Sequence, residues 1–124
     1  MELHFELCPG YLRAVARGRE TAEETRSAHQ QLFAEIGRHG VSRVLAVALQ
    51  SRPIFVVESY NLSAVLEQMA AIAGFRLALL SDTPEMFSSH QYVQLLAQQR
   101  GLAVRAFRDE EPAVAWLLEG QESS

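Results

Sequence analysis

The sequence predicts an α/β fold: a single domain in which a mixed five-stranded sheet is flanked by four helices. From residue 43 onward, short apolar segments alternate with helical patterns, which is typical of parallel strands joined by crossover helices. Before them, two segments of alternating polarity flank Pro9-Gly10, which predicts an antiparallel hairpin. A length of 124 residues suits one domain with one core.

The hairpin and the first helix are predicted by local patterns. Apolar and polar residues alternate over residues 3–7 and 11–16, which is the period of half-buried strands. Cys8 stands at the corner of the hairpin, where nothing in the sequence would activate its thiol. Thr21 and Glu24 have the spacing of a capping box, and Gly40 can end the helix, so we expect a helix over residues 22–39.

Three further apolar segments predict parallel strands. Arg43–Leu49 is apolar on both faces, which places it in the middle of the sheet with helices on both sides. Residues 75–80 and 102–107 have the same character. The element order β-β-α-β-α-β-α-β-α therefore predicts sequentially stacked strands, with the hairpin at one edge and the last strand at the other.

Three more helices are expected between and after these strands, the first over residues 62–73. Small polar residues and glycines mark their boundaries, and residues 121–124 are expected to form a disordered tail. The expected N-terminal caps are Asn61 or Ser59, Asp82 and Asp109, and the expected ends are Gly74, Gly101 and Gly120.

Composition argues against several functional classes. The net charge is −4, and the densest basic cluster, formed by Arg17, Arg19 and Arg26, is interleaved with glutamates. We expect these arginines to be a solvated surface and expect no nucleic-acid partner. The longest apolar run, residues 44–49, is too short to span a membrane. A single cysteine, and the absence of a signal-peptide pattern in residues 1–6, predict a cytoplasmic protein.

No catalytic, metal or cofactor motif stands out. Glycine-rich phosphate loops are absent from the sequence. His29 and His90 lie on or near the inner faces of their helices, but neither belongs to a metal-binding pair, so we expect core or rim positions for both. The sequence therefore predicts a protein without enzyme activity, metal or cofactor.

The segment that the fold explains least is residues 52–57, where four large apolar residues follow one another between a strand and a helix. Either this segment packs over the core as a loop or short strand, or it is an exposed patch for a partner, a second subunit or an apolar ligand. The residues of this candidate surface are Ile54, Phe55, Val56, Val57, Tyr60 and Leu62.

Three segments carry a resemblance to a known family: the strand RVLAVAL at Arg43–Leu49, the strand RLALL at residues 76–80, and the ending GLAVRAFRDEEPAVAWL at residues 101–117. Together with the element order, they make the chain similar to the STAS superfamily, and more closely to bacterial SpoIIAA-like or STAS/SEC14-like domains. The resemblance covers nearly the whole chain in element order and mainly the second half in residues.

The resemblance implies a non-enzymatic regulatory module that binds a protein partner or a second copy of itself as a homodimer. STAS-type anti-sigma-factor antagonists are switched by phosphorylation of a serine at the start of the helix after the third strand, a role that would fall on Ser59 or Ser63. Either serine could instead be a plain helix cap. The SEC14-like side implies an alternative, an apolar-ligand or lipid-binding module, with a cavity lined by Phe55, Leu62, Met69 and Met86.

Overall fold

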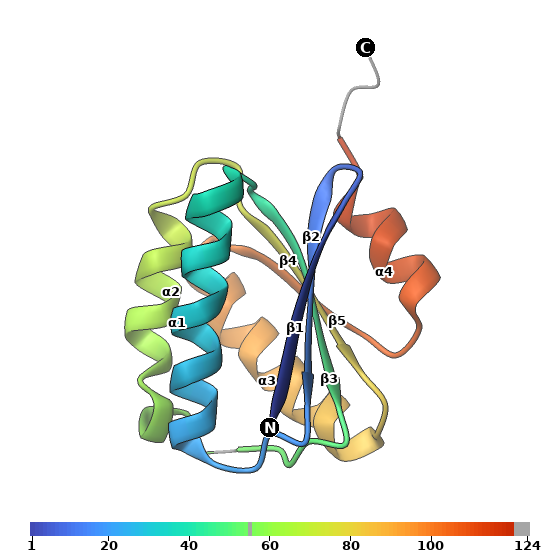
Figure 1. Ribbon diagram of the computed structural model, residues 1–124. Helices are drawn as coiled ribbons and strands as arrows, with labels where there is room; N and C mark the ends of the chain where they lie inside the picture. The colour runs from blue at the N-terminus through green and yellow to red at the C-terminus, as the bar shows by residue number, and fades with distance from the viewer. Residues whose placement is uncertain (55, 121–124) are drawn as a thin grey trace.

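A computed structural model describes residues 1–54 and 56–120, and it has the α/β architecture that the sequence predicts, with one mixed five-stranded sheet and four α-helices (Figure 1). Phe55 lies outside the described residues, as do residues 121–124. The surface role predicted for Phe55 and the disordered tail predicted at 121–124 therefore both fall outside the part of the chain described below.

Every expected strand and helix is present, and a short 3-10 helix is added before α2. The strands are β1 (Glu2–Cys8), β2 (Tyr11–Arg17), β3 (Arg43–Leu49), β4 (Arg76–Ser81) and β5 (Ala103–Phe107). The helices are α1 (Ala22–His39), the 3-10 helix η1 (Val57–Tyr60), α2 (Leu62–Ala70), α3 (Pro84–Gln98) and α4 (Glu110–Leu117).

The strands stack in sequence order, β1-β2-β3-β4-β5, as predicted. β1 pairs antiparallel with β2 through the hairpin, and every later pair is parallel. Because consecutive parallel strands are neighbours, α1, α2 and α3 cross back over the same face of the sheet, as Figure 1 shows, and α4 covers the other face alone.

Two hydrophobic cores result, one on each face of the sheet. β3 contributes to both, because Val44 belongs to the larger core under α1–α3 while Leu45 and Val47 belong to the smaller core under α4. All three side chains are at most 4% exposed. The prediction that this strand is buried on both faces is thereby confirmed.

The helix boundaries confirm some expected caps and correct others. Thr21 and Glu24 form the predicted capping box, and Gly40 ends α1 in the left-handed conformation with φ 63°. Asp82 does not cap α3: Thr83 accepts the hydrogen bond from the Met86 N–H, while Asp82 accepts one from the Gln50 N–H. A neighbouring strand end thus engages the carboxylate that sequence spacing assigned to the helix.

The second and fourth helices depart from expectation in detail. α2 ends at Ala70, before the expected residue 73, because the chain then turns and the Ile72 N–H bonds to the Met69 carbonyl. Asn61 and Asp109 do occupy N-cap positions, but neither side chain makes a capping hydrogen bond. Asn61 has instead a left-handed backbone, with φ 57°, at the junction of η1 and α2.

Within residues 1–54 and 56–120, no helix has both the length and the apolar character needed to cross a lipid bilayer.

Candidate functional site

Two adjoining cavities lie inside the larger core, between the sheet and the helices that cover it. The hairpin cavity, of about 120 Å³, is partly open and is lined mainly by residues of β1, β2, β3 and α1, with Leu3, Phe5 and Leu32 among its walls. The helix cavity, of about 90 Å³, is also partly open and is lined by residues that include those of η1, α2, α3 and β4, with Leu62, Met69 and Met86 among its walls. Both far exceed the space of one water molecule, and a cavity of comparable size in another protein holds benzene.

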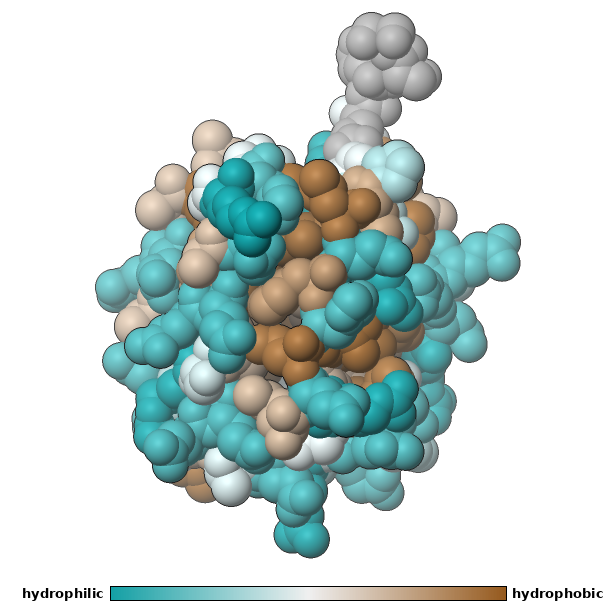
Figure 2. Space-filling model, in the orientation of Figure 1, coloured by the Kyte–Doolittle hydropathy of each residue, from teal (hydrophilic) through white to brown (hydrophobic). Residues whose placement is uncertain are grey.

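The hairpin cavity lies beside the molecular face along which β1 runs. Figure 2 shows apolar residues gathered on that face, next to the polar surface of α1. Leu3 and Phe5 of the edge strand are only half-buried, although they point toward α1 and line this cavity. A short apolar path therefore leads from the surface to the interior at this point.

The two cavities share a polar wall in an otherwise apolar interior. Four polar residues line both cavities: Arg19 in the loop after β2, Thr25 and His29 on α1, and His90 on α3. Leu79 of β4 lines both cavities too. We call Arg19, His29 and His90 the basic centre. Basic side chains are seldom buried without hydrogen-bonding or charged partners. The contacts of these three residues therefore indicate whether the cavities are a binding site or only gaps in the packing.

Arg19 carries a charge into this interior. Its guanidinium donates to Thr25 Oγ1 at 2.9 Å and to the main-chain carbonyl of Arg52 at 2.6 Å. Its Nε is buried and has no hydrogen-bond partner, and no ion pair of Arg19 occurs among the described residues. Burial lowers the pKa of the guanidinium, which nevertheless remains charged at neutral pH. Arg19 is half-buried, which corrects the sequence-based expectation of a fully solvated side chain, whereas Arg17 and Arg26 are exposed as expected.

The two histidines face the same wall as neutral rings. Burial, reinforced by the positive charge of Arg19, lowers the pKa of His29 and of His90 to about 4. His90 is 8% exposed, and the Nδ1 atom of each ring is buried without a hydrogen-bond partner in the described part of the chain. A neutral imidazole offers one N–H donor and one acceptor, so each ring can bond to a molecule in the cavities.

The ionisable groups of this centre are poor general bases at neutral pH. A general base works best with a pKa near the working pH, and a pKa of about 4 makes both imidazoles weak bases at pH 7. The hydroxyl of Thr25, which lines both cavities, already donates to the Thr21 carbonyl while accepting from Arg19. The tightly packed Tyr60 ring meets His29 edge-on, with ring centroids 5.7 Å apart, and adds another wall of the helix cavity.

Most of the predicted candidate surface is interior. Val57, Tyr60 and Leu62 are at most 8% exposed, and Ile54 is half-buried against the larger core. Val56, which is 65% exposed, remains on the surface. Ile54, Tyr60 and Leu62 line the helix cavity, so the segment packs over the core and forms one side of the cavity. Binding by these residues stays a prediction.

The predicted ligand cavity, between α2, α3 and the sheet, coincides with the helix cavity. Leu62, Met69 and Met86 line it as expected, and Phe55 lies outside the described residues. The hairpin cavity and the basic centre were missed by sequence reasoning. The feature of the sequence that could have indicated them was the pair of histidines on inner helix faces. What these histidines can do chemically depends on the cavities beside them, which the sequence does not reveal.

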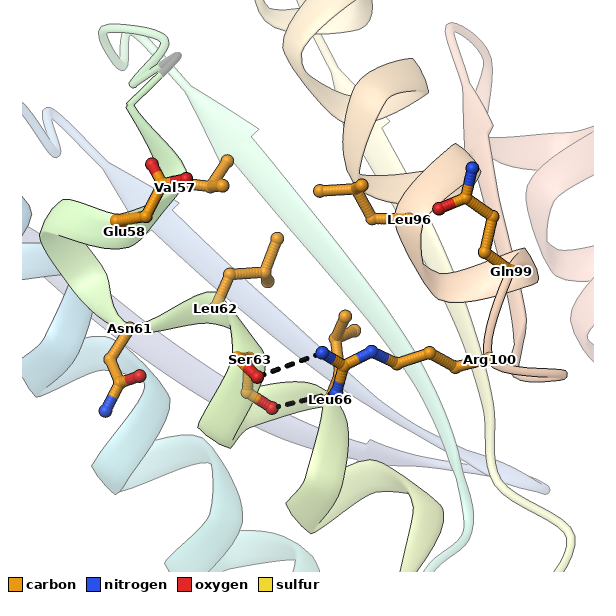
Figure 3. Close-up of a pocket in the computed structure, with 9 residues that line it drawn as sticks. All are labelled: Val57, Glu58, Asn61, Leu62, Ser63, Leu66, Leu96, Gln99 and Arg100. Carbon is orange, nitrogen blue, oxygen red and sulfur yellow. Dashed lines mark hydrogen bonds between the residues drawn. The ribbon is translucent and has the colours of Figure 1, made fainter.

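Ser63 lies in a separate surface groove of about 300 Å³, between the start of α2 and the end of α3 (Figure 3). Arg100 reaches across this groove and donates to the Ser63 carbonyl at 3.3 Å and to its hydroxyl at 2.9 Å. Val57, Leu62 and Leu96 supply apolar walls. Because Ser63 is exposed and already faces an arginine, a phosphate there would meet a positive charge.

Ser59 does not share this groove. Its hydroxyl donates to the Val56 carbonyl at 2.6 Å within the turn of η1, and its own carbonyl accepts a hydrogen bond from Arg26. Neither serine caps a helix through its side chain. Both phosphorylation candidates thus lie near a guanidinium, but of the two hydroxyls only that of Ser63 accepts a hydrogen bond from one in the described part of the chain.

No group of three or more histidine, cysteine, aspartate or glutamate side chains among residues 1–54 and 56–120 is arranged to hold a metal ion. Comparison with known proteins yields neither a matching family model nor a matching curated protein.

Proposed function

We propose that this chain is a non-enzymatic binding module that holds a compact apolar molecule in the hairpin and helix cavities. One observation carries the proposal: two adjoining, mainly apolar cavities share the lining residues Arg19, His29 and His90, each of which has one buried polar atom without a partner in the described chain. Buried polar groups are normally satisfied, and a bound molecule would satisfy these. The combination of apolar walls with a few converging polar groups is typical of ligand sites.

The test uses a panel of small apolar compounds: benzoate, hexanoate, octanoate, octanol and cyclohexanol. Thermal denaturation and native mass spectrometry of the purified protein should show stabilisation and added mass with at least one of them. Ala28 lines the hairpin cavity, so Ala28→Leu should fill it and abolish binding there. The matched control is Ala115→Leu on the exposed face of α4, which should bind as the wild type does. Absence of binding by every compound would overturn the proposal.

We also propose a second role, regulation through the groove that Ser63 and Arg100 share, because the phosphate of a modified Ser63 would replace a hydroxyl that Arg100 already contacts. The partner would be another protein or a second copy of the chain, in a reducing compartment such as the cytoplasm, where Cys8 would stay a free thiol. Mass spectrometry of the protein isolated from its own cells should find phosphate on Ser63 rather than Ser59.

The second role can be tested without knowing the partner protein, by measuring whether the chain associates with itself. Sedimentation equilibrium of wild type, Ser63→Asp and Arg100→Gln should show a dimerisation constant that both substitutions change. Ser88→Asp, at an exposed position of α3, is the matched control. If Ser63 carries no phosphate in cells and all four proteins behave alike, the regulatory proposal fails without affecting the ligand-binding one.

A further inference from the structure

We infer, on the basis of the function proposed above, that the molecule held by this chain is an amphiphile with a carboxylate head, which Arg19, His29 and His90 receive, and a short apolar tail. The proposed function requires only an apolar molecule of suitable size. The charge and the donor pattern of the basic centre define its head group.

Charge is the first argument. A guanidinium taken out of water is expensive unless an anion accompanies it. The acidic side chain that acts on Arg19 from a distance is Glu24, whose Oε1 atom accepts the N–H groups of Glu20 and Thr21 in the capping box of α1. No carboxylate among the described residues enters either cavity. A ligand anion would supply the missing charge.

The free edge of the guanidinium is the second argument. The Arg19 Nε–H has no partner, and the adjacent Nη2, besides its bond to the Arg52 carbonyl, reaches only the Met86 sulfur, at 3.6 Å. A thioether is a weak acceptor. The Nε–H and the Nη2 hydrogen that the Arg52 carbonyl does not use are the donors left for the two oxygens of a carboxylate, which guanidinium groups bind side by side.

The histidines extend the same donor set. His29 and His90 come from different helices and line both cavities, and each has a buried Nδ1 atom without a partner in the described chain. As the Nδ1–H tautomer, each ring has a donor left for a ligand that reaches it. Tyr60 also faces the helix cavity, and burial raises the pKa of its phenol, so it stays an uncharged group beside the anion. A site with one fixed positive charge suits a monoanion.

Size and polarity define the tail. Apart from the residues at the shared wall, the hairpin cavity is lined by apolar side chains, including Leu3, Phe5 and Leu32, and it lies beside the apolar face seen in Figure 2. Its volume of about 120 Å³ suits a short acyl chain or a single ring, with any longer tail directed toward that face.

The test compares octanoate with octanol, which share a tail and differ in charge, by calorimetric titration at pH 7. We expect octanoate to bind at least about tenfold more tightly, because a charge-assisted hydrogen bond exceeds a neutral one. Arg19→Met keeps the apolar stem and should weaken octanoate binding about tenfold or more, leaving octanol unchanged. Arg17→Met, which removes an exposed arginine two residues away, should have no effect on either.

A second measurement needs no variant, in case Arg19→Met does not fold. In NMR titrations of the wild type, saturating octanoate should raise the pKa of His29 and His90, since an adjacent anion favours the imidazolium, and octanol should not. Equal affinity for the two compounds, with unmoved histidine titrations, would overturn the carboxylate head and leave the binding module standing. Failure of both compounds, and of the wider panel, to bind would remove the proposed function itself.

Discussion

The guanidinium of Arg19 donates a hydrogen bond of 2.6 Å to the main-chain carbonyl of Arg52, and the Arg52 N–H donates one of 2.8 Å to the Arg19 carbonyl. These reciprocal bonds join the loop after β2 to the loop after β3. The same guanidinium lines both cavities, so one side chain connects the interior site with the segment that leads into η1 and to the exposed Val56.

We expect Arg19→Met to loosen the segment before η1 while leaving the global fold nearly as stable. Removing an incompletely paired, partly buried charge relieves its desolvation cost and loses hydrogen bonds, so the free energy of unfolding should change by less than about 1 kcal/mol. Hydrogen exchange should accelerate at Ser59 and Asn61, with β3 and β4 unaffected. Unchanged exchange in η1 would show that the Arg19–Arg52 bonds do not hold this segment.

Acid should destabilise the protein through the buried His90 and the half-buried His29. Each has a folded-state pKa of about 4, below the value near 6.5 expected for the unfolded chain, so the unfolded state takes up protons first. This stability is fully present above about pH 6.5 and is lost as the pH falls toward 4. We expect a loss of about 2 kcal/mol per histidine between pH 7 and pH 5.

Chemical denaturation at a series of pH values measures this loss. Carboxylates also titrate at the acid end, so the control is the double variant His29→Gln, His90→Gln, which retains every acidic side chain. Its stability should vary less between pH 7 and pH 5 than that of the wild type. Identical pH profiles would show that neither imidazole is kept neutral by burial.

Filling the hairpin cavity should stabilise the protein. Ala28 is half-buried on α1 and faces β1 and β2 across the cavity, where a larger side chain finds space. Ala28→Leu should raise the free energy of unfolding by about 0.5–1 kcal/mol, the usual gain from filling a cavity. Ala115→Leu, on exposed α4, should leave stability within about 0.5 kcal/mol of the wild type. A clear loss of stability in Ala28→Leu would mean that the hairpin cavity has no room for the larger side chain.

A substitution in the smaller core under α4 should lower the stability of the fold without changing ligand affinity. Leu117 is 0% exposed, and Leu117→Ala should cost about 2–4 kcal/mol of unfolding free energy. Because α4 lies across the sheet from both cavities, octanoate affinity measured where the variant is folded should match the wild type. A parallel loss of affinity would show that the two faces of the sheet are coupled.

Local patterns were sufficient for most of the architecture. The capping box at Thr21 and Glu24 and the two-sided burial of Arg43–Leu49 follow from residue types and their spacing along the chain. The cap assigned to Asp82 was wrong because its carboxylate bonds to Gln50, a residue brought close only by strand pairing. The early end of α2 was missed because Ile72 continues the apolar spacing of the helix although the chain turns there.

For the candidate site, the difference between what the sequence predicts and what only the folded structure shows is larger. From the sequence alone come the strand order, the presence of helices on both faces of the sheet, and the position of His29 and His90 on or near inner helix faces, because these depend on the order of the elements and on periodicities within single segments.

Arg19 lies close in sequence to Arg17 and Glu20 and so resembles solvated surface. Its position is fixed by hydrogen bonds to Thr25 and to the Arg52 carbonyl, which only the folded chain brings together. Cavities and unpaired buried atoms arise from the distances between elements remote in the chain, which no local pattern encodes.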